Sequence, residues 1–476
     1  MKTGTIIGSI GLGGLAVFIG QMDAIALPGG GDEGGVASGP DVIVGALPDI
    51  SHYAPAVWQS VTYCAYAVGT TSCNIGNQQL LWQPNPATTH PVMPQNIFRV
   101  KNGVIKQIGQ SWIKHGFCAL QGTLCGACIP AGSGCPTVLG IGCSDPYSSG
   151  LNGGQGDLKS RWGVNAATGV YSGTYADPAI PAGYPSSIRE RITVPRNDLD
   201  STMNAGAQYF IEGQYVQIQD ATSQNDNNNA SYRKINVGTT FSASTGYSIT
   251  LTGPTYQMIP AIYAWQTVHT DVAIREYDVA GDGRFLVGSR AFQNTNGTWH
   301  YAYAVHNLNS DRNGGSFSVP LATGVVVTNA AYHAPFNHSG DNYTNTPWTP
   351  TVSAGSITWA CEPNTSTNAH CIRWATMHTF EFDANSGPTD ASQILTLGIW
   401  KAPTTGSPET SIAVQGKKPL PVVPPCVPGD LDCNGVVDGA DLGVLLGCWG
   451  VACGDCNSDG YTDGSDLSVL LSAWVP

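Results

Sequence analysis

The feature that most constrains this 476-residue chain is a twelve-residue segment near its C-terminus that occurs twice, 25 positions apart. Both copies, 430–441 and 455–466, carry Asp or Asn at positions 1, 3, 5, 9 and 12 and Gly at position 6. Oxygen side chains at this spacing converge on one calcium ion while the chain wraps it, with a backbone carbonyl at position 7. We therefore predict two calcium ions, held by Asp430, Asp432, Asn434, Val436, Asp438, Asp441, Asp455, Asn457, Asp459, Tyr461, Asp463 and Asp466. The alternative is a pair of Asp/Asn/Gly-rich turns in an acidic tail.

Each loop is followed by an apolar stripe at positions i, i+3, i+4 and i+7, which predicts two amphipathic helices. The stripes consist of Leu442, Leu445, Leu446 and Trp449, and of Leu467, Leu470, Leu471 and Trp474. From Pro419 to the end there are eight Asp and no Lys or Arg, which leaves −5 of the net −13 for the rest. We expect the helices to pack together and calcium to neutralise the carboxylates. Without the ion, the small domain should loosen.

A duplicated loop–helix unit that lacks a first helix resembles the type I dockerin repeat, over about residues 429–476. The resemblance implies a pair of half EF-hands that attaches a secreted, polysaccharide-degrading protein to a cohesin. It also places the cohesin contact at loop positions 10 and 11, here Gly439-Ala440 and Gly464-Ser465. The Ser/Thr pair typical of the family is mostly absent at these positions. The resemblance as a whole implies a cohesin-like or cell-surface protein as the partner of the C-terminal module, with a polysaccharide as a second candidate partner.

The N-terminus has the order of a secretory signal peptide, residues 1–26. A basic start at Lys2 precedes an apolar run from Ile6 to Gly20 and an Ala24-Ile25-Ala26 site. The alternative is a membrane anchor, but the run is short and interrupted by glycines. We predict export to the outside or to the cell surface, with no membrane span after cleavage.

Composition favours a mainly β protein with antiparallel sandwich-like bodies and long loops. Only 11% of residues are charged, too few for the outer faces of many amphipathic helices. No basic patch is present, so nucleic acid is not an expected partner. The predicted divisions after the signal are a Gly-rich tether (27–40), a disulfide-stapled β-rich domain (41–253), a β-sandwich-like domain (254–402), a Pro-rich linker (403–428) and the dockerin-like domain (429–476).

The second body has the clearer strand pattern. Phe285–Phe292 is followed by Asn294-Thr-Asn-Gly297, which predicts a hairpin turn. The next segment, Trp299–Val305, alternates large and small side chains at period two, as a strand does.

The fourteen cysteines indicate disulfides, because an exported protein folds in an oxidising compartment. The isolated couples predict the bonds Cys64–Cys73 and Cys361–Cys371. Connectivity stays open within the two groups of five, which are Cys118, Cys125, Cys128, Cys135 and Cys143, and Cys426, Cys433, Cys448, Cys453 and Cys456. The spacing of Cys125 and Cys128 also fits a redox or zinc motif, although structural disulfides are favoured in this setting.

No specific catalytic motif (G-x-S-x-G, H-E-x-x-H or a P-loop) is present upstream of the tail. Weaker candidates for a glycosidase pair are Glu190, Glu212, Glu276 and Asp278. Arg189 and Arg191 make Glu190 the poorest proton donor. Candidates for a histidine metal site are His300, His306, His333 and His338. The segment 278–283 has the start of a calcium turn but lacks the later ligands.

Three classes of function follow from these observations. The first, which we favour, is a non-catalytic surface protein whose β-rich bodies bind glycan or build a structure, with the calcium module as attachment device. The second is a polysaccharide-degrading hydrolase with a divergent site, which needs an acid pair about 5–10 Å apart. The third is a metal-dependent oxidoreductase, which needs three histidines that converge on one point.

Overall fold

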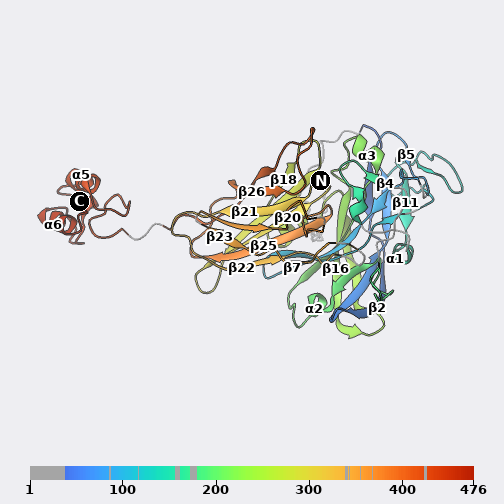
Figure 1. Cartoon of the computed structure of the whole chain (residues 1–476), viewed down its shortest axis with the longest axis horizontal. Helices are drawn as coiled ribbons and strands as arrows, with labels where there is room; N and C mark the ends of the chain where they lie inside the picture. The colour runs from blue at the N-terminus through green and yellow to red at the C-terminus, as the bar shows by residue number, and fades with distance from the viewer. Residues whose placement is uncertain are drawn as a thin grey trace, which may run out of the picture.

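The computed structural model describes residues 38–84, 87–115, 117–155, 161–171, 180–337, 341, 343–353, 355–366, 368–422 and 426–475 (Figure 1). The predicted signal peptide, nearly all of the tether, and His338 lie outside these residues. The described chain is mainly β, with antiparallel sheets, as predicted. In these residues, no helix is both long and apolar enough to cross a membrane.

The first body is built on an eight-stranded antiparallel sheet with the order β17-β16-β15-β7-β8-β14-β3-β2. Side chains alternate between its faces, so that Ile97 and Ile211 enter one core while Phe98 and Phe210 enter another. The sheet is therefore covered on both sides. Its strands are β2 (Ile50–Trp58), β3 (Val61–Val68), β7 (Gln95–Lys101), β8 (Val104–Gln110), β14 (Ile192–Pro195), β15 (Gln208–Gln214), β16 (Ala230–Ser242) and β17 (Gly246–Tyr256).

A cysteine-rich region belongs to the same body and forms small sheets of its own. A three-stranded sheet has the order β1-β4-β11, and three two-stranded ribbons and short helices accompany it. The elements are β1 (Val42–Ala46), β4 (Thr70–Asn74), β5 (Leu80–Leu81), β6 (Val92–Met93), β9 (Lys114–His115), β10 (Val138–Leu139), β11 (Ser144–Tyr147), α1 (Ser149–Gly154), η1 (Arg161–Gly163), β12 (Val164–Asn165), β13 (Val170–Tyr171), α2 (Arg196–Leu199) and α3 (Ile218–Thr222).

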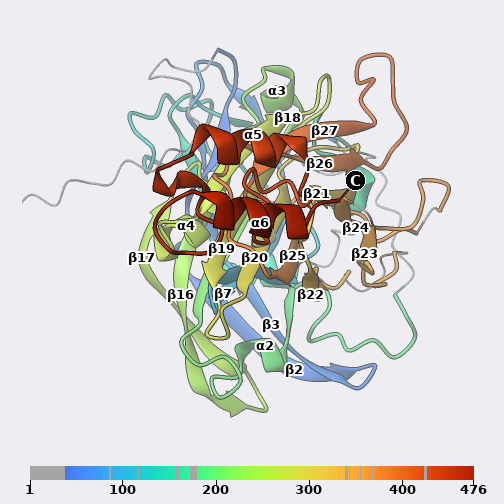
Figure 2. The same cartoon turned by 90° about the vertical axis from the view of Figure 1, so that its left-hand side faces the viewer.

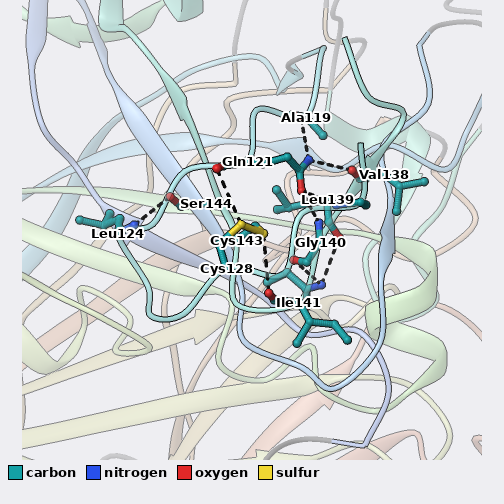
Figure 3. Close-up of a disulfide and its surroundings, with 12 residues drawn as sticks. Ala119, Gln121, Leu124, Cys128, Val138, Leu139, Gly140, Ile141, Cys143 and Ser144 are labelled. Atoms are coloured by element: carbon teal, nitrogen blue, oxygen red, sulfur yellow. Dashed lines mark hydrogen bonds between the residues drawn. A yellow bond between two sulfur atoms is a disulfide. The ribbon is translucent and has the colours of Figure 1, made fainter. Parts of the chain in front are cut away.

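Three disulfides close this region: Cys73–Cys125, Cys118–Cys135 and Cys128–Cys143. Figure 3 shows Cys128–Cys143 beside Gln121, whose side chain donates to the carbonyls of Ala119 and Val138 at 2.8 and 3.0 Å. A polar side chain and disulfides thus hold a segment that has little regular secondary structure.

The predicted bond Cys64–Cys73 is wrong, because Cys73 is bonded to Cys125. Cys64 lies on β3 of the eight-stranded sheet as a buried free thiol, and Cys73 lies on β4. The predicted bond Cys361–Cys371 is also absent, and both thiols are free. Burial raises the pKa of Cys371 to about 11 and also raises that of Cys361, which favours the protonated thiol at both positions.

The second body is a sandwich of two five-stranded antiparallel sheets, β18-β19-β20-β25-β22 and β23-β24-β21-β26-β27. Their facing sides enclose a core rich in aromatic residues, in which Phe317 stacks on Phe380 and makes a tilted contact with Tyr303. The elements are α4 (Tyr263–Val268), β18 (Ala273–Asp278), β19 (Arg284–Gln293), β20 (Trp299–Asn307), β21 (Gly314–Pro320), β22 (Val327–His333), β23 (Thr351–Ser353), β24 (Ser356–Ala360), β25 (Thr376–Ala384), β26 (Gln393–Ile399) and β27 (Ser411–Gly416).

The hairpin predicted between β19 and β20 is present. Gln293 pairs with Trp299 across the turn, and Gly297 has a φ of 87°, which glycine adopts without strain. The segment 403–428, predicted as a linker, departs from expectation. It contains β27, which pairs with β26 and buries Val414, so the apolar positions of 411–416 complete the sandwich.

The alternation of large and small side chains in β20 has a structural reason. Tyr301, Tyr303 and Val305 face the sandwich core. Ala302 and Ala304 face the eight-stranded sheet and share a core with Phe98. The neighbouring strand β25 is buried along its whole length. The two bodies therefore share a core, and the boundary predicted at 253/254 falls inside β17.

The C-terminal segment contains two helices, α5 (Gly439–Gly447) and α6 (Gly464–Ser472), joined through η2 (Ala452–Gly454), and Figure 2 shows the two helices side by side. Disulfides Cys426–Cys433 and Cys448–Cys453 brace them, and Cys456 is free. The helices pack as predicted, but only Val437, Leu445 and Leu470 are fully enclosed. Three residues of the predicted stripes, Leu446, Trp449 and Leu471, are at least half exposed.

Candidate functional site

The first loop, 430–441, is organised by the carboxylates at its two ends. Asp430 accepts hydrogen bonds from the amides of Asn434 and Gly435 at 3.1 and 2.9 Å. Asp441 accepts from Leu431 and Asp432 with one oxygen, and from Asp438 with the other. The loop thus folds back on itself until its first and last residues meet.

The second loop, 455–466, repeats this arrangement. Asp455 accepts from the amides of Asp459 and Gly460 at 3.1 and 2.7 Å, and Asp466 accepts from Cys456, Asn457 and Asp463. Gly435 and Gly460 have φ of 91° and 97°, the conformation that selects glycine at position 6. The two segments therefore share a backbone course as well as a sequence pattern.

Each loop gathers three carboxylates. Oxygens of Asp430, Asp432 and Asp441 all lie within 4.8 Å of one another, and so do those of Asp455, Asp459 and Asp466. The third acid stands at position 3 in one loop and position 5 in the other. Hard oxygen donors at this density suit calcium. Among the described residues, these are the two groups of three or more His, Cys, Asp or Glu that are close enough to share one ion.

The acids at positions 9 and 12 also start the helices. Asp438 and Asp463 are N-caps that accept from the amides of Ala440 and Ser465, and each forms a capping box with the acid at position 12. Backbone hydrogen bonds, first that from Asp463, hold the pKa of Asp466 below its ordinary value. The acid at position 12 accepts hydrogen bonds from amides of its loop and also belongs to the capping box of the helix. The conformations of loop and helix are therefore coupled.

The remaining predicted ligands lie on the loop surface. Asn434 and Asp459 accept from the amides two residues further on, and Asn457 accepts from Asp459. Val436 and Tyr461 expose 42% and 66% of their surface, in keeping with a position that contributes only its backbone carbonyl.

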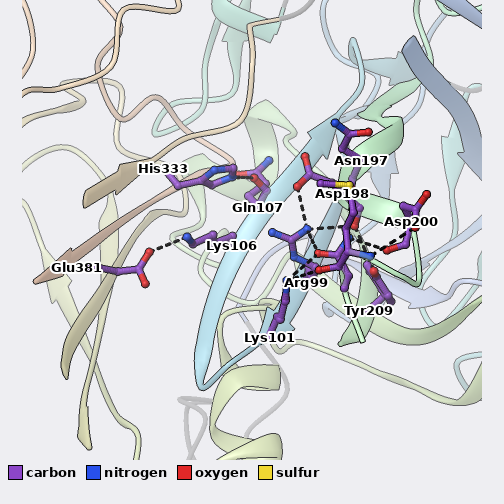
Figure 4. A network of polar contacts seen from close by, with 12 residues as sticks. Arg99, Lys101, Lys106, Gln107, Asn197, Asp198, Asp200, Tyr209, His333 and Glu381 are labelled. Atoms are coloured by element: carbon purple, nitrogen blue, oxygen red, sulfur yellow. Dashed lines mark hydrogen bonds and ion pairs between the residues drawn. The ribbon is translucent and has the colours of Figure 1, made fainter. Parts of the chain in front are cut away.

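A second polar site, absent from the sequence predictions, is a pocket of about 320 Å³ where β7 and β8 approach β19, β20 and β25. It is lined by Arg99, Lys101, Asn102, Val104, Lys106, Phe292, Asn294, His300 and Glu381. Figure 4 shows how Lys106 reaches Glu381, while Arg99 turns toward Asp198.

Ion pairs organise this pocket. Glu381 Oε1 lies 2.6 Å from Lys106 Nζ, and Glu381 Oε2 lies 3.2 Å from His300 Nε2. The other ring nitrogen of His300, Nδ1, lies 2.7 Å from Asp383 Oδ1. Burial opposes ionisation of Glu381, but His300 and Lys106 outweigh it and lower its pKa to about 2. Burial likewise disfavours the charged form of His300, yet Glu381 and Asp383 raise its pKa above the ordinary value. The available sequence signal was the pair of acids, Glu381 and Asp383, that alternates with Phe380, Phe382 and Ala384.

None of the four predicted catalytic acids lines the pocket. Glu276 and Asp278 both pair with Arg284, at 2.6 and 2.7 Å. Glu190 pairs with its neighbour Arg189. Each of these carboxylates has a structural partner.

Glu212 is fully buried in the core between the two bodies. Burial raises its pKa to about 7, and its oxygens accept from Asn96 Nδ2 at 2.9 Å and from the amide of Ala261 at 2.6 Å. Glu212 is therefore a buried carboxylate with structural hydrogen bonds, and solvent does not reach it.

The three candidate histidines that are described lie in separate surroundings, which agrees with the alternative of histidines with structural contacts. His300 lies in the pocket, His306 is fully buried beside Phe98, and His333 Nε2 lies 2.8 Å from the carbonyl of Gln107. Because they are an even number of positions apart, His300 and His306 lie on the same face of β20. They are too far apart along the strand to bind one metal ion. In the 278–283 segment, Asp282 accepts from the amides of Asp311 and Arg312, so it fixes a loop.

No protein-family model, no curated protein and no solved structure matches this chain.

Proposed function

We propose that this is an exported, non-catalytic protein that is attached to a partner through a calcium-binding C-terminal module, residues 429–476. The observation that carries the proposal is the pair of three-carboxylate groups, one in each of two loops that share the same pattern of backbone hydrogen bonds. Four Asp in each loop place a charge of −4 on twelve residues, with no Lys or Arg in the segment. Two calcium ions, with a charge of +2 each, offset half of the total −8 and relieve its self-repulsion.

Export is supported by five disulfides in the described residues, bonds that persist in an oxidising compartment. The attachment role is supported by apolar surface on a very small body. Leu446, Trp449 and Leu471 are 55%, 50% and 55% exposed, and exposed apolar groups of this kind mark protein contacts. A cohesin-like or cell-surface protein is the proposed partner.

The test is calcium binding by the full chain, compared with a variant carrying Asp432→Ala and Asp459→Ala. These two acids stand in the carboxylate groups and cap no helix. We expect calorimetry and equilibrium dialysis to show two fewer bound ions per chain in the variant. Asp390→Asn, an exposed acid in the second body, is the matched control and should bind as the wild type does. Equal binding by wild type and double variant at millimolar calcium would refute the proposal.

For the β-rich part, we propose glycan binding at the pocket between the bodies. Lys101 is the one lining cation whose described contacts are neutral oxygens, those of Met203 and Asn204, so the pocket favours an acidic sugar. Phe292 supplies an apolar wall. Titration with an acidic and a neutral polysaccharide tests this. Binding of the acidic one should weaken in Lys101→Ala, and equal binding of both by wild type would count against it.

A further inference from the structure

A second set of acidic and amide side chains lies far along the sequence from the C-terminal loops, where the described chain begins. Asp41 precedes β1, Asp220 belongs to α3, and Asn228 and Asn229 precede β16. The amide of Val42 donates to Asp220 Oδ1 at 2.9 Å, and Asn229 Nδ2 donates to Asp220 Oδ2 at 2.6 Å. Asn228 Nδ2 donates to Asp41 Oδ2 at 3.2 Å, which closes a ring of contacts. We call these four residues the β1 cluster.

The two acids of the β1 cluster are buried without a basic partner. Asp41 is 2% exposed and Asp220 is 0% exposed. No ion pair among the described residues includes either of them. Burial of an uncompensated carboxylate is costly.

Three oxygens of the β1 cluster are buried and accept no hydrogen bond: Asp41 Oδ1, Asn228 Oδ1 and Asn229 Oδ1. Buried polar atoms almost always have a partner, so three in one ring of contacts need an explanation. Each amide nitrogen donates to a carboxylate, which leaves the amide oxygen as the unused end. Each of these oxygens therefore needs a hydrogen-bond donor or a cation, and no described side chain donates to it.

We propose that the β1 cluster binds one calcium ion, with side-chain oxygens of Asp41, Asn228 and Asn229 and the carboxylate of Asp220 as ligands. The donor set is entirely oxygen, as a hard cation requires, and two carboxylates balance its charge of +2. Both acids then stay ionised inside the protein, and the three unpartnered oxygens gain a partner. The ion connects β1, α3 and the loop before β16. This site is independent of the C-terminal loops.

The test counts bound calcium in the full chain after removal of divalent ions and equilibration with calcium. Asp41→Asn keeps the shape of the side chain and removes one charged ligand, so the number of ions per chain should fall by one. The double variant Asp432→Ala, Asp459→Ala should keep the ion that Asp41→Asn loses. The control Asp390→Asn should change nothing. This design separates the two proposals, because each variant removes ions from one region only.

Asn228→Ala provides a second variant if Asp41→Asn disturbs folding, since Asn228 is half-buried in a loop and carries no charge. We expect calcium affinity at the β1 cluster to fall by about tenfold or more. Calcium should also raise the thermal midpoint of the β-rich part in the double variant but not in Asp41→Asn. A cluster filled by water, or by protonated acids, predicts the same calcium count in Asp41→Asn as in wild type, and that result would overturn the proposal.

Discussion

The ion pairs of Glu381 should make stability depend on pH in two directions, and Glu381→Gln tests this. In the folded protein, the carboxylate interacts with Lys106 Nζ at 2.6 Å and His300 Nε2 at 3.2 Å, and its side chain is 11% exposed. Gln keeps the size of the side chain and removes the charge. The substitution therefore isolates the electrostatic contribution.

The magnitude follows from the pKa of Glu381, which the fold lowers from 4.5 to about 2. This difference corresponds to about 3 kcal/mol of the free energy of unfolding, present above pH 4.5 and lost as the pH falls toward 2. The pKa of His300 is raised from 6.5, so its contribution is present below pH 6.5 and is lost as the pH rises through its folded-state pKa. These two pairs together favour maximal stability between pH 4.5 and 6.5.

Urea denaturation of wild type and Glu381→Gln over a series of pH values measures the effect. We expect the variant to lose up to about 3 kcal/mol near neutral pH and to show a shallower decline in acid. Asp278→Asn is the matched control, because that carboxylate is 65% exposed in its pair with Arg284 and should cost less than about 1 kcal/mol. Parallel stability curves for wild type and Glu381→Gln between about pH 5 and 2 would refute the reasoning.

Three further predictions concern packing and covalent bonds. Leu470→Ala should cost the C-terminal module about 2–4 kcal/mol, seen as faster hydrogen exchange in 426–475, whereas Leu471→Ala on the exposed side should change little. Ala304→Leu should destabilise the β-rich part by about 1–3 kcal/mol in urea, because its side chain is enclosed between two sheets; an unchanged midpoint would contradict the shared core. Cys143→Ser opens the bond to Cys128 and should lower stability by about 3 kcal/mol, and addition of a reductant should then lower it less than in wild type.

Local patterns in the sequence predicted the parts of the fold that depend on local chemistry. Asn294–Gly297 specified its hairpin because Gly297 needs positive φ, and the two helices follow their loops because Asp438 and Asp463 are caps. Partners at long range were not predictable. Cys73 bonds Cys125 across 52 residues, and nothing in the spacing of the cysteines distinguishes that bond from Cys64–Cys73.

The sites show the same division. The carboxylates of the C-terminal loops are close together in sequence, so their spacing already predicted that they meet. The pocket joins Lys106 on β8 to Glu381 on β25, and the β1 cluster joins Asp41 to Asn228. Such contacts depend on how sheets stack, and a single sequence gives no measure of stacking.

The core shared by the two bodies also sets a time scale for folding during synthesis. Thr379 Oγ1 on β25 donates to the carbonyl of Ile105 on β8, a partner 274 residues earlier. At about 5–20 residues per second, Thr379 is made about 14–55 s after Ile105. During that interval the core that contains Phe98 and Val100 is incomplete, because Met377 of β25 also belongs to it. The nascent chain therefore carries apolar strand residues that are not fully covered until the second body is complete.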